Sequence, residues 1–185
     1  MKQRTVAVLL GSLRRDSYNR RLMLAVERLA PPHLLFQQVR IDDLPLYSQD
    51  FDDDYPPNAR RLKNDIQSAQ ALLFVTPEYN RSVPGALKNA VDIGSRPKGT
   101  NSFAGKPAAV IGASTGAIGT AIAQHHLRSS LHFLDVPTLG QPEVYLQFRD
   151  EIIAPDGTVT NASTRTFLQR FVDAYAAWVE RFMQD

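Results

Sequence analysis

A strand–loop–helix unit near the start of the chain decides the fold, and residues 5–30 read TVAVLLGSLRRDSYNRRLMLAVERLA. Its first run, Thr5–Leu10, is apolar without polar alternation, which is typical of a strand buried on both faces of a parallel sheet. After a polar loop, apolar residues recur every three to four positions and predict a helix over Asn19–Ala30. The sequence therefore opens with the first half of a β–α–β unit.

The same alternation continues along the chain. Three further runs are candidate strands: Leu34–Ile41, Ala71–Thr76 and Pro107–Ala113. Helical spacing follows at Asn58–Ala69, and the clearest helix of all is predicted from Leu168 onward. Strands and helices that alternate about five times predict an α/β fold, a doubly wound parallel sheet with helices on both faces, in one domain over residues 1–185.

Composition excludes several classes of function. The 21 basic residues exceed the 19 acidic ones only slightly, which does not indicate a nucleic-acid binder. The chain has no cysteine, so it has no disulfide, thiolate nucleophile or cysteine-ligated metal. Its apolar runs are too short for a signal peptide or a membrane span. We expect a cytoplasmic protein whose partners are neither nucleic acid nor membrane.

The first loop, Gly11–Asn19, joins the buried strand to a helix through hydroxyls, an amide and two arginines. Free backbone N–H groups and the helix dipole make such a junction an anion site. The loop matches neither the Walker pattern nor GxGxxG, which weakens the nucleotide-hydrolase and standard dinucleotide interpretations. The alternative is that Ser17 or Asn19 caps a helix and the arginines are solvated.

The second loop lies in residues 76–92, which read TPEYNRSVPGALKNAVD. Pro84 suits the first position of a helix and favours an extended residue before it, so a rigid polar loop separates a strand from a new helix. Proline, tyrosine and amide side by side could support a flat aromatic ligand from its edge. Lys88 and Asp92 are four residues apart and are interpreted as a surface pair.

Together, GSLRRDSYNRRL and TPEYNRSVPGALKNAVD resemble the signature of the NADPH-dependent FMN reductase family of flavodoxin-like proteins, which includes chromate, quinone and azo-dye reductases. The resemblance implies a flavodoxin-like five-stranded sheet with strand order 2-1-3-4-5. It also implies FMN as cofactor, NADPH or NADH as co-substrate, and hydride transfer to a small-molecule acceptor, either a quinone, an azo dye, chromate or a flavin. Such a protein would be a homodimer or homotetramer.

The resemblance further assigns contacts to FMN. The residues it implies for the phosphate are Ser12, Arg14, Ser17 and Asn19; those for the isoalloxazine ring are Pro77, Glu78, Tyr79, Asn80 and Ser82; those for the pyrimidine end are Ser114, Thr115 and Gly116. No side chain is assigned a catalytic role, because hydride passes between nicotinamide and flavin and the protein supplies orientation. No metal ligand is predicted either.

Two other functions compete with this interpretation. Gly112–Gly116 also satisfies GxSxG, the nucleophile elbow of a serine hydrolase with Ser114 as nucleophile. However, Asp135 is the first acid after that serine and follows the last histidine, so the order serine, acid, histidine cannot be made. A flavin-binding protein that only shuttles electrons or senses redox state is the second alternative; the near-neutral charge favours an enzyme that takes an anionic dinucleotide.

A single doubly wound domain offers little cover for a ring bound at its strand ends, whereas ligand sites usually bury most of the ligand. We therefore expect a second copy of the chain to complete the pocket. The candidate contacts are Ile93–Ser102 and the helix that carries His125 and His126.

Overall fold

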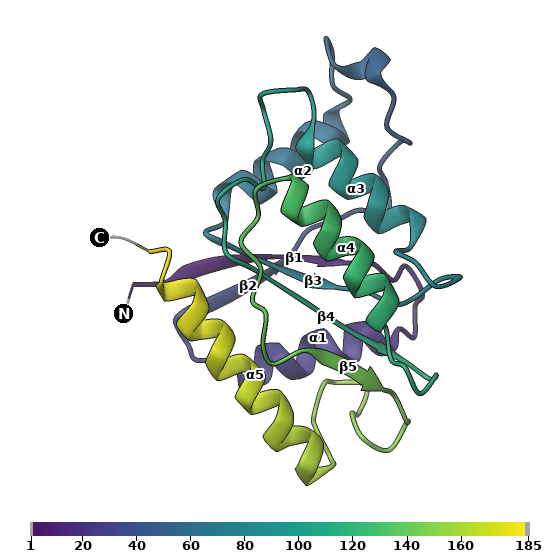
Figure 1. The fold of residues 1–185 in the computed structure, drawn as a ribbon, viewed down its shortest axis with the longest axis vertical. Coiled ribbons are helices and arrows are strands. Elements are labelled where there is room, and N and C mark those ends of the chain that lie inside the picture. The colour runs from purple at the N-terminus through teal and green to yellow at the C-terminus, as the bar shows by residue number, and fades with distance from the viewer. Residues whose placement is uncertain (1, 184–185) are drawn as a thin grey trace.

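The computed structural model describes residues 2–183, in which one five-stranded sheet is covered by helices on both faces (Figure 1). The strands are β1 (Arg4–Leu10), β2 (Leu34–Gln38), β3 (Ala71–Val75), β4 (Ala108–Ser114) and β5 (Val144–Gln147). The helices are α1 (Tyr18–Leu29), α2 (Pro57–Ser68), α3 (Gly85–Ser95), α4 (Ala121–Phe133) and α5 (Ala162–Glu180), with a short 3-10 turn at Gln49–Phe51.

The sheet has the order β2-β1-β3-β4-β5, and every pair of neighbouring strands is parallel. This confirms the predicted doubly wound fold and its strand order. Because β1, β3 and β4 are adjacent, the loops that leave their carboxyl ends meet at one edge of the sheet. In doubly wound sheets that edge is where ligands bind.

Two cores explain why the strands read as continuous apolar runs. Along β1, Val6, Val8 and Leu10 point into one core, and Ala7 and Leu9 point into the other. The first core packs under α1 and α5, the second under α2, α3 and α4 (Figure 1). Within residues 2–183, none of the helices is long and apolar enough to cross a membrane.

Two element boundaries differ from the sequence predictions by more than one residue. Helix α5 begins at Ala162 rather than Leu168, because Asn161 caps it by accepting a hydrogen bond from the Thr164 amide at 2.9 Å, and the first turn carries no buried apolar residue to reveal it. Strand β2 ends at Gln38; the remaining apolar residues of the predicted strand, Val39 and Ile41, are buried in the second core from a loop.

Candidate functional site

Three loops meet at the carboxyl ends of β1, β3 and β4 and enclose a cleft of about 170 Å³. Nine of the residues expected to bind FMN line it: Ser12, Arg14, Ser17, Asn19, Pro77, Glu78, Tyr79, Ser114 and Thr115. A second cleft of about 470 Å³ shares Glu78 and Ser114 with the first and adds Asn80 and Gly116. The sequence-predicted residues are thus brought together, with the exception of Ser82. We call the first space the flavin cleft.

The first turn of α1 is fixed by two buried polar side chains. Ser17 is the N-cap, and its hydroxyl accepts a hydrogen bond from the Arg20 amide at 3.2 Å. Asn19 clamps α1 to β4, since its Nδ2 donates to the Ala113 carbonyl and its Oδ1 accepts from the Ala113 amide, both at 2.9 Å. The helix-cap interpretation therefore holds for Ser17, and Asn19 ties the first loop to the third.

The donors of the first loop are left open for an anion. Within the part of the chain that the structure describes, the backbone amides of Ser12, Leu13 and Arg14 donate to no other group. The Arg14 side chain is exposed, and its guanidinium lies over the Tyr18 ring, 4.8 Å from the centroid. Free amides in a loop that leads into a helix N-terminus, beside an arginine, form a donor set that fits a phosphate dianion.

The second loop contains a tight two-residue turn. Tyr79 and Ser82 exchange two backbone hydrogen bonds of 3.0 and 2.9 Å, and the residues between them, Asn80 and Arg81, have φ angles of 50° and 61°. Asparagine tolerates this left-handed region, whereas arginine rarely adopts it. The turn leaves the Tyr79 side chain 53% exposed at the mouth of the cleft.

Glu78 fixes this loop to α4. Its Oε2 accepts from the amides of Ile122 and Ala123, both at 3.0 Å, and its Oε1 lies 3.4 Å from the Arg81 guanidinium. The residue at the start of α4, Thr120, makes no side-chain cap of its own. Glu78 therefore serves as a remote N-cap, and its carboxylate stabilises the positive end of the α4 dipole.

The third loop turns on a hydroxyl. Ser114 Oγ accepts from the Gly116 amide at 3.2 Å and has no histidine partner among residues 2–183. The histidine nearest to a serine hydroxyl is His126, whose Nδ1 lies 3.0 Å from Ser82 Oγ. The nucleophile–base pair that a serine hydrolase requires is not formed at Ser114.

Three roles were not predicted from the sequence. The Asn19 clamp, the Glu78 cap and the contact of Ser82 with His126 all join residues at least 44 positions apart. The tight turn between Tyr79 and Ser82 does have a local signal in the sequence. It is the pair Asn80-Arg81, since asparagine favours the left-handed conformation that such turns require. Lys88 and Asp92 form the predicted exposed pair at 2.7 Å.

Comparisons with known proteins agree on one family. A sequence profile described as NADPH-dependent FMN reductase matches residues 4–151. A 2-hydroxy-1,4-benzoquinone reductase from a Burkholderia species is 53% identical over 174 residues, which cover 94% of this chain and 95% of the relative. The solved structure of FerB, a flavoenzyme NAD(P)H:(acceptor) oxidoreductase from Paracoccus denitrificans, superposes with a TM-score of 0.93 at 48% identity and covers 97% of this chain and 98% of its own. A flavodoxin variant from Pseudomonas aeruginosa shares the fold at a TM-score of 0.59 and 19% identity, covering 95% of this chain and 99% of its own.

Proposed function

Because this chain belongs to the NADPH-dependent FMN reductase family, we propose that it reduces quinones with NADPH, using FMN bound in the flavin cleft. The family makes it an NAD(P)H-dependent oxidoreductase that works through FMN, rather than a passive electron carrier. The overall reaction takes NADPH, a proton and a quinone to NADP⁺ and a hydroquinone. The observation that carries the proposal is the meeting of three loops, from β1, β3 and β4, around one cleft.

We assign the cofactor contacts by loop. The first loop would hold the phosphate through its open amides, Ser12 and Arg14, with Ser17 and Asn19 fixing the helix beneath them. The second loop would support the ring through the backbone around Pro77 and the ring of Tyr79, because the Glu78 carboxylate is already engaged by α4. Ser114, Thr115 and Gly116 would face the pyrimidine end. Asn80 lies in the adjoining cleft, where it would border the same ring.

When bound, FMN supplies hydride chemistry, so the chain needs no acid–base pair of its own and contributes orientation. Two backbone hydrogen bonds and a remote helix cap hold the second loop rigid enough to fix a ring edge. The adjoining cleft is a single space of about 470 Å³, and we take donor and acceptor to share it. Donor and acceptor would therefore bind in turn, which gives ping-pong kinetics.

Steady-state kinetics of the FMN-loaded protein test this function. We expect NADPH oxidation with 1,4-benzoquinone and parallel double-reciprocal lines when quinone is varied at several NADPH concentrations. An azo dye, chromate and free FMN, offered in the same assay, establish whether the acceptor range extends beyond quinones. A protein that binds FMN but oxidises neither NADPH nor NADH with any acceptor would contradict the proposal.

We also propose that a second copy of the chain covers the flavin cleft. The segments expected to make the contact, Ile93–Ser102 and α4, border a groove of about 600 Å³ that lies between α3, the loop after it and α4. Phe133 on the rim of this groove is 84% exposed. An aromatic side chain left open beside a groove favours burial against another protein surface. Sedimentation should therefore report a dimer or tetramer, and Phe133→Glu should lower its association constant. A wild-type monomer with full turnover at nanomolar concentration would exclude a shared pocket.

Residues 1–185 would act as one domain, since all five described strands belong to one sheet between two cores. We propose that the protein acts in the cytoplasm, where NADPH is the general reductant. Fractionation of cells that express the tagged chain tests the location.

A further inference from the structure

A groove of about 590 Å³ runs beside the first loop, at the carboxyl ends of β1 and β2. Its charged lining consists of Arg14, Arg15, Arg20, Arg40 and one acid, Asp42. We call this space the arginine groove. Four arginines against one aspartate leave an excess of positive charge, although the whole chain is close to neutral. Such a local excess indicates an anionic ligand.

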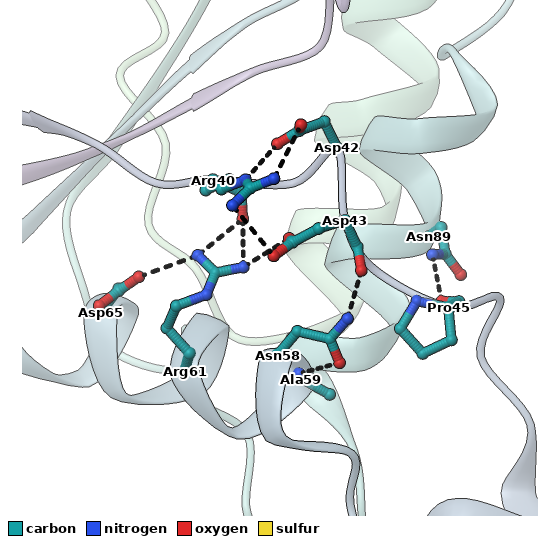
Figure 2. Close-up of polar contacts among 9 residues, drawn as sticks. All are labelled: Arg40, Asp42, Asp43, Pro45, Asn58, Ala59, Arg61, Asp65 and Asn89. Atoms are coloured by element: carbon teal, nitrogen blue, oxygen red, sulfur yellow. Dashed lines mark hydrogen bonds and ion pairs between the residues drawn. The ribbon is translucent and has the colours of Figure 1, made fainter.

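The aspartate does not neutralise the free arginines, because it is already occupied. Arg40 Nε donates to Asp42 at 2.8 Å, and Arg40 Nη1 lies 3.7 Å from Asp43 (Figure 2). Arg61 anchors this corner from α2, donating to the Arg40 carbonyl at 3.2 Å and to Asp43 at 2.7 Å. Arg40 therefore borders the groove with its charge already paired. In contrast, within residues 2–183 the side chains of Arg15 and Arg20 form no hydrogen bond or ion pair, and both are exposed.

The arginine groove is continuous with the flavin cleft, since Ser12 and Arg14 line both. The cleft on the other side of the flavin cleft offers no comparable charge, because its Arg81 is paired with Glu78. The groove between α3 and α4 carries basic residues but shares no lining residue with the flavin cleft. Ser12 and Arg14 belong to the phosphate end of the flavin cleft, so a dinucleotide whose nicotinamide lies against the flavin ring would extend past that end into the strongly positive arginine groove.

From this continuity and charge, we propose that the arginine groove binds the 2′-phosphate end of NADPH and selects NADPH over NADH. The inference rests on the proposed function, because it takes the nicotinamide to lie against the ring of FMN bound in the flavin cleft. Guanidinium groups bind a phosphomonoester through paired, charge-assisted hydrogen bonds, and an arginine is a general means of accommodating the 2′-phosphate of NADP. Arg15 and Arg20 make these bonds, whereas Arg40, which is already paired with Asp42 and Asp43, only borders the groove.

The selectivity follows from what NADH lacks. Without the 2′-phosphate, the free guanidinium groups of Arg15 and Arg20 stay hydrated and gain nothing from the dinucleotide. Two lost charge-assisted hydrogen bonds correspond to a drop in affinity on the order of 100-fold or more. The loss appears in the binding of NADPH, not in the rate of hydride transfer, because neither arginine lines the flavin cleft.

The test uses a double variant that carries Arg15→Gln and Arg20→Gln. The control is a second double variant, Arg165→Gln with Arg170→Gln, which removes the same charge from exposed positions on α5. We expect the KM for NADPH to rise at least about 10-fold in the first double variant, with the KM for NADH within about 2-fold of wild type and kcat unchanged for both. The control should match wild type in KM and kcat for NADPH and in KM and kcat for NADH. Equal rises for NADPH and NADH, or no preference for NADPH in the wild type, would overturn the proposal.

Calorimetric titration of the FMN-loaded protein separates this inference from the proposed function, because it needs no turnover. Adenosine 2′,5′-bisphosphate should bind the wild type and lose at least about 10-fold in affinity in the arginine variant, whereas 5′-AMP should bind both weakly. A protein that turns over no dinucleotide yet shows this pattern would refute the function and leave the groove intact. If inorganic phosphate displaced the bisphosphate at equal concentration, the groove would be a general anion site and the proposed dinucleotide specificity would be wrong.

Discussion

The first and second loops leave the same edge of the sheet and are built in opposite ways. In the first, the amides of Ser12, Leu13 and Arg14 make no hydrogen bonds to other groups of residues 2–183, and its arginines are exposed. In the second, Tyr79 and Ser82 close a turn by two backbone bonds while Glu78 is held by α4. A loop with open donors gains its hydrogen bonds from the ligand, whereas a braced loop positions the ligand. The contrast predicts that the first loop governs affinity for an anion and the second governs stability and the placement of a ring.

The largest loss in the free energy of unfolding is expected at Asn19. The contrast depends on this residue because it joins the helix that follows the first loop to the strand that precedes the third loop. Asn19→Leu leaves the Ala113 amide and carbonyl buried without partners. Two such groups cost about 2–6 kcal/mol in the free energy of unfolding. Urea unfolding of the FMN-free protein measures the loss.

Asn19→Asp is the matched control for size. It keeps an acceptor for the Ala113 amide, but its ionised form cannot donate to the Ala113 carbonyl and buries a negative charge beside it, so its loss near neutral pH should be at least that of Asn19→Leu and should shrink at low pH, where the protonated carboxyl can donate. If Asn19→Leu unfolded at the wild-type urea concentration, the clamp would contribute nothing and the loops would be independent.

The next effect concerns the braced loop. Glu78→Ala removes the acceptor for the Ile122 and Ala123 amides and should lower the free energy of unfolding by about 2–3 kcal/mol. Glu78→Gln keeps one oxygen but loses the charge at the helix end, and a smaller loss of about 1 kcal/mol is expected. Fluorescence titration should show that both variants weaken FMN and riboflavin by the same factor, because the proposed contacts of the second loop are with the ring and not with the phosphate.

The open loop should show the reverse pattern. Arg14→Ala should weaken FMN by about 10- to 150-fold, the value of one charge-assisted hydrogen bond, and should lower the free energy of unfolding of the FMN-free protein by no more than about 1 kcal/mol, the value of its contact with the Tyr18 ring. Riboflavin, which lacks the phosphate, should bind Arg14→Ala as it binds the wild type in the same titration. Equal losses for both flavins would mean that this loop does not hold the phosphate, and the distinction between the two loops would fail.

How far the sequence predicted these features depends on the range of the contacts involved. Four strands followed from local apolar runs, because a strand buried on both faces leaves a clear pattern, whereas the strand order came from the family resemblance that the two loop motifs carry and β5 was not located from its own residues. The start of α5 was missed because its first turn carries no buried apolar residue, and the end of β2 because Val39 and Ile41 are buried from a loop. The loops that gather at the flavin cleft were predicted, but not what braces them. The Glu78 cap joins residues more than 40 positions apart, and no local pattern records such a contact.

The smallest effect is expected at Arg81, where the braced loop carries backbone strain. At a φ of 61°, a residue other than glycine or asparagine is disfavoured by about 1–2 kcal/mol. Arg81→Gly removes this strain but gives the unfolded chain more freedom, which offsets about 0.5–1 kcal/mol of the gain. It also loses the ion pair with Glu78, which is worth little because the Arg81 side chain is 65% exposed. The free energy of unfolding should therefore stay within about 1 kcal/mol of wild type, whereas Arg81→Val, with a branched Cβ, should lose about 2 kcal/mol. Urea unfolding of the two variants side by side measures the difference, and equal losses would show that the backbone conformation at Arg81 does not hold the turn together.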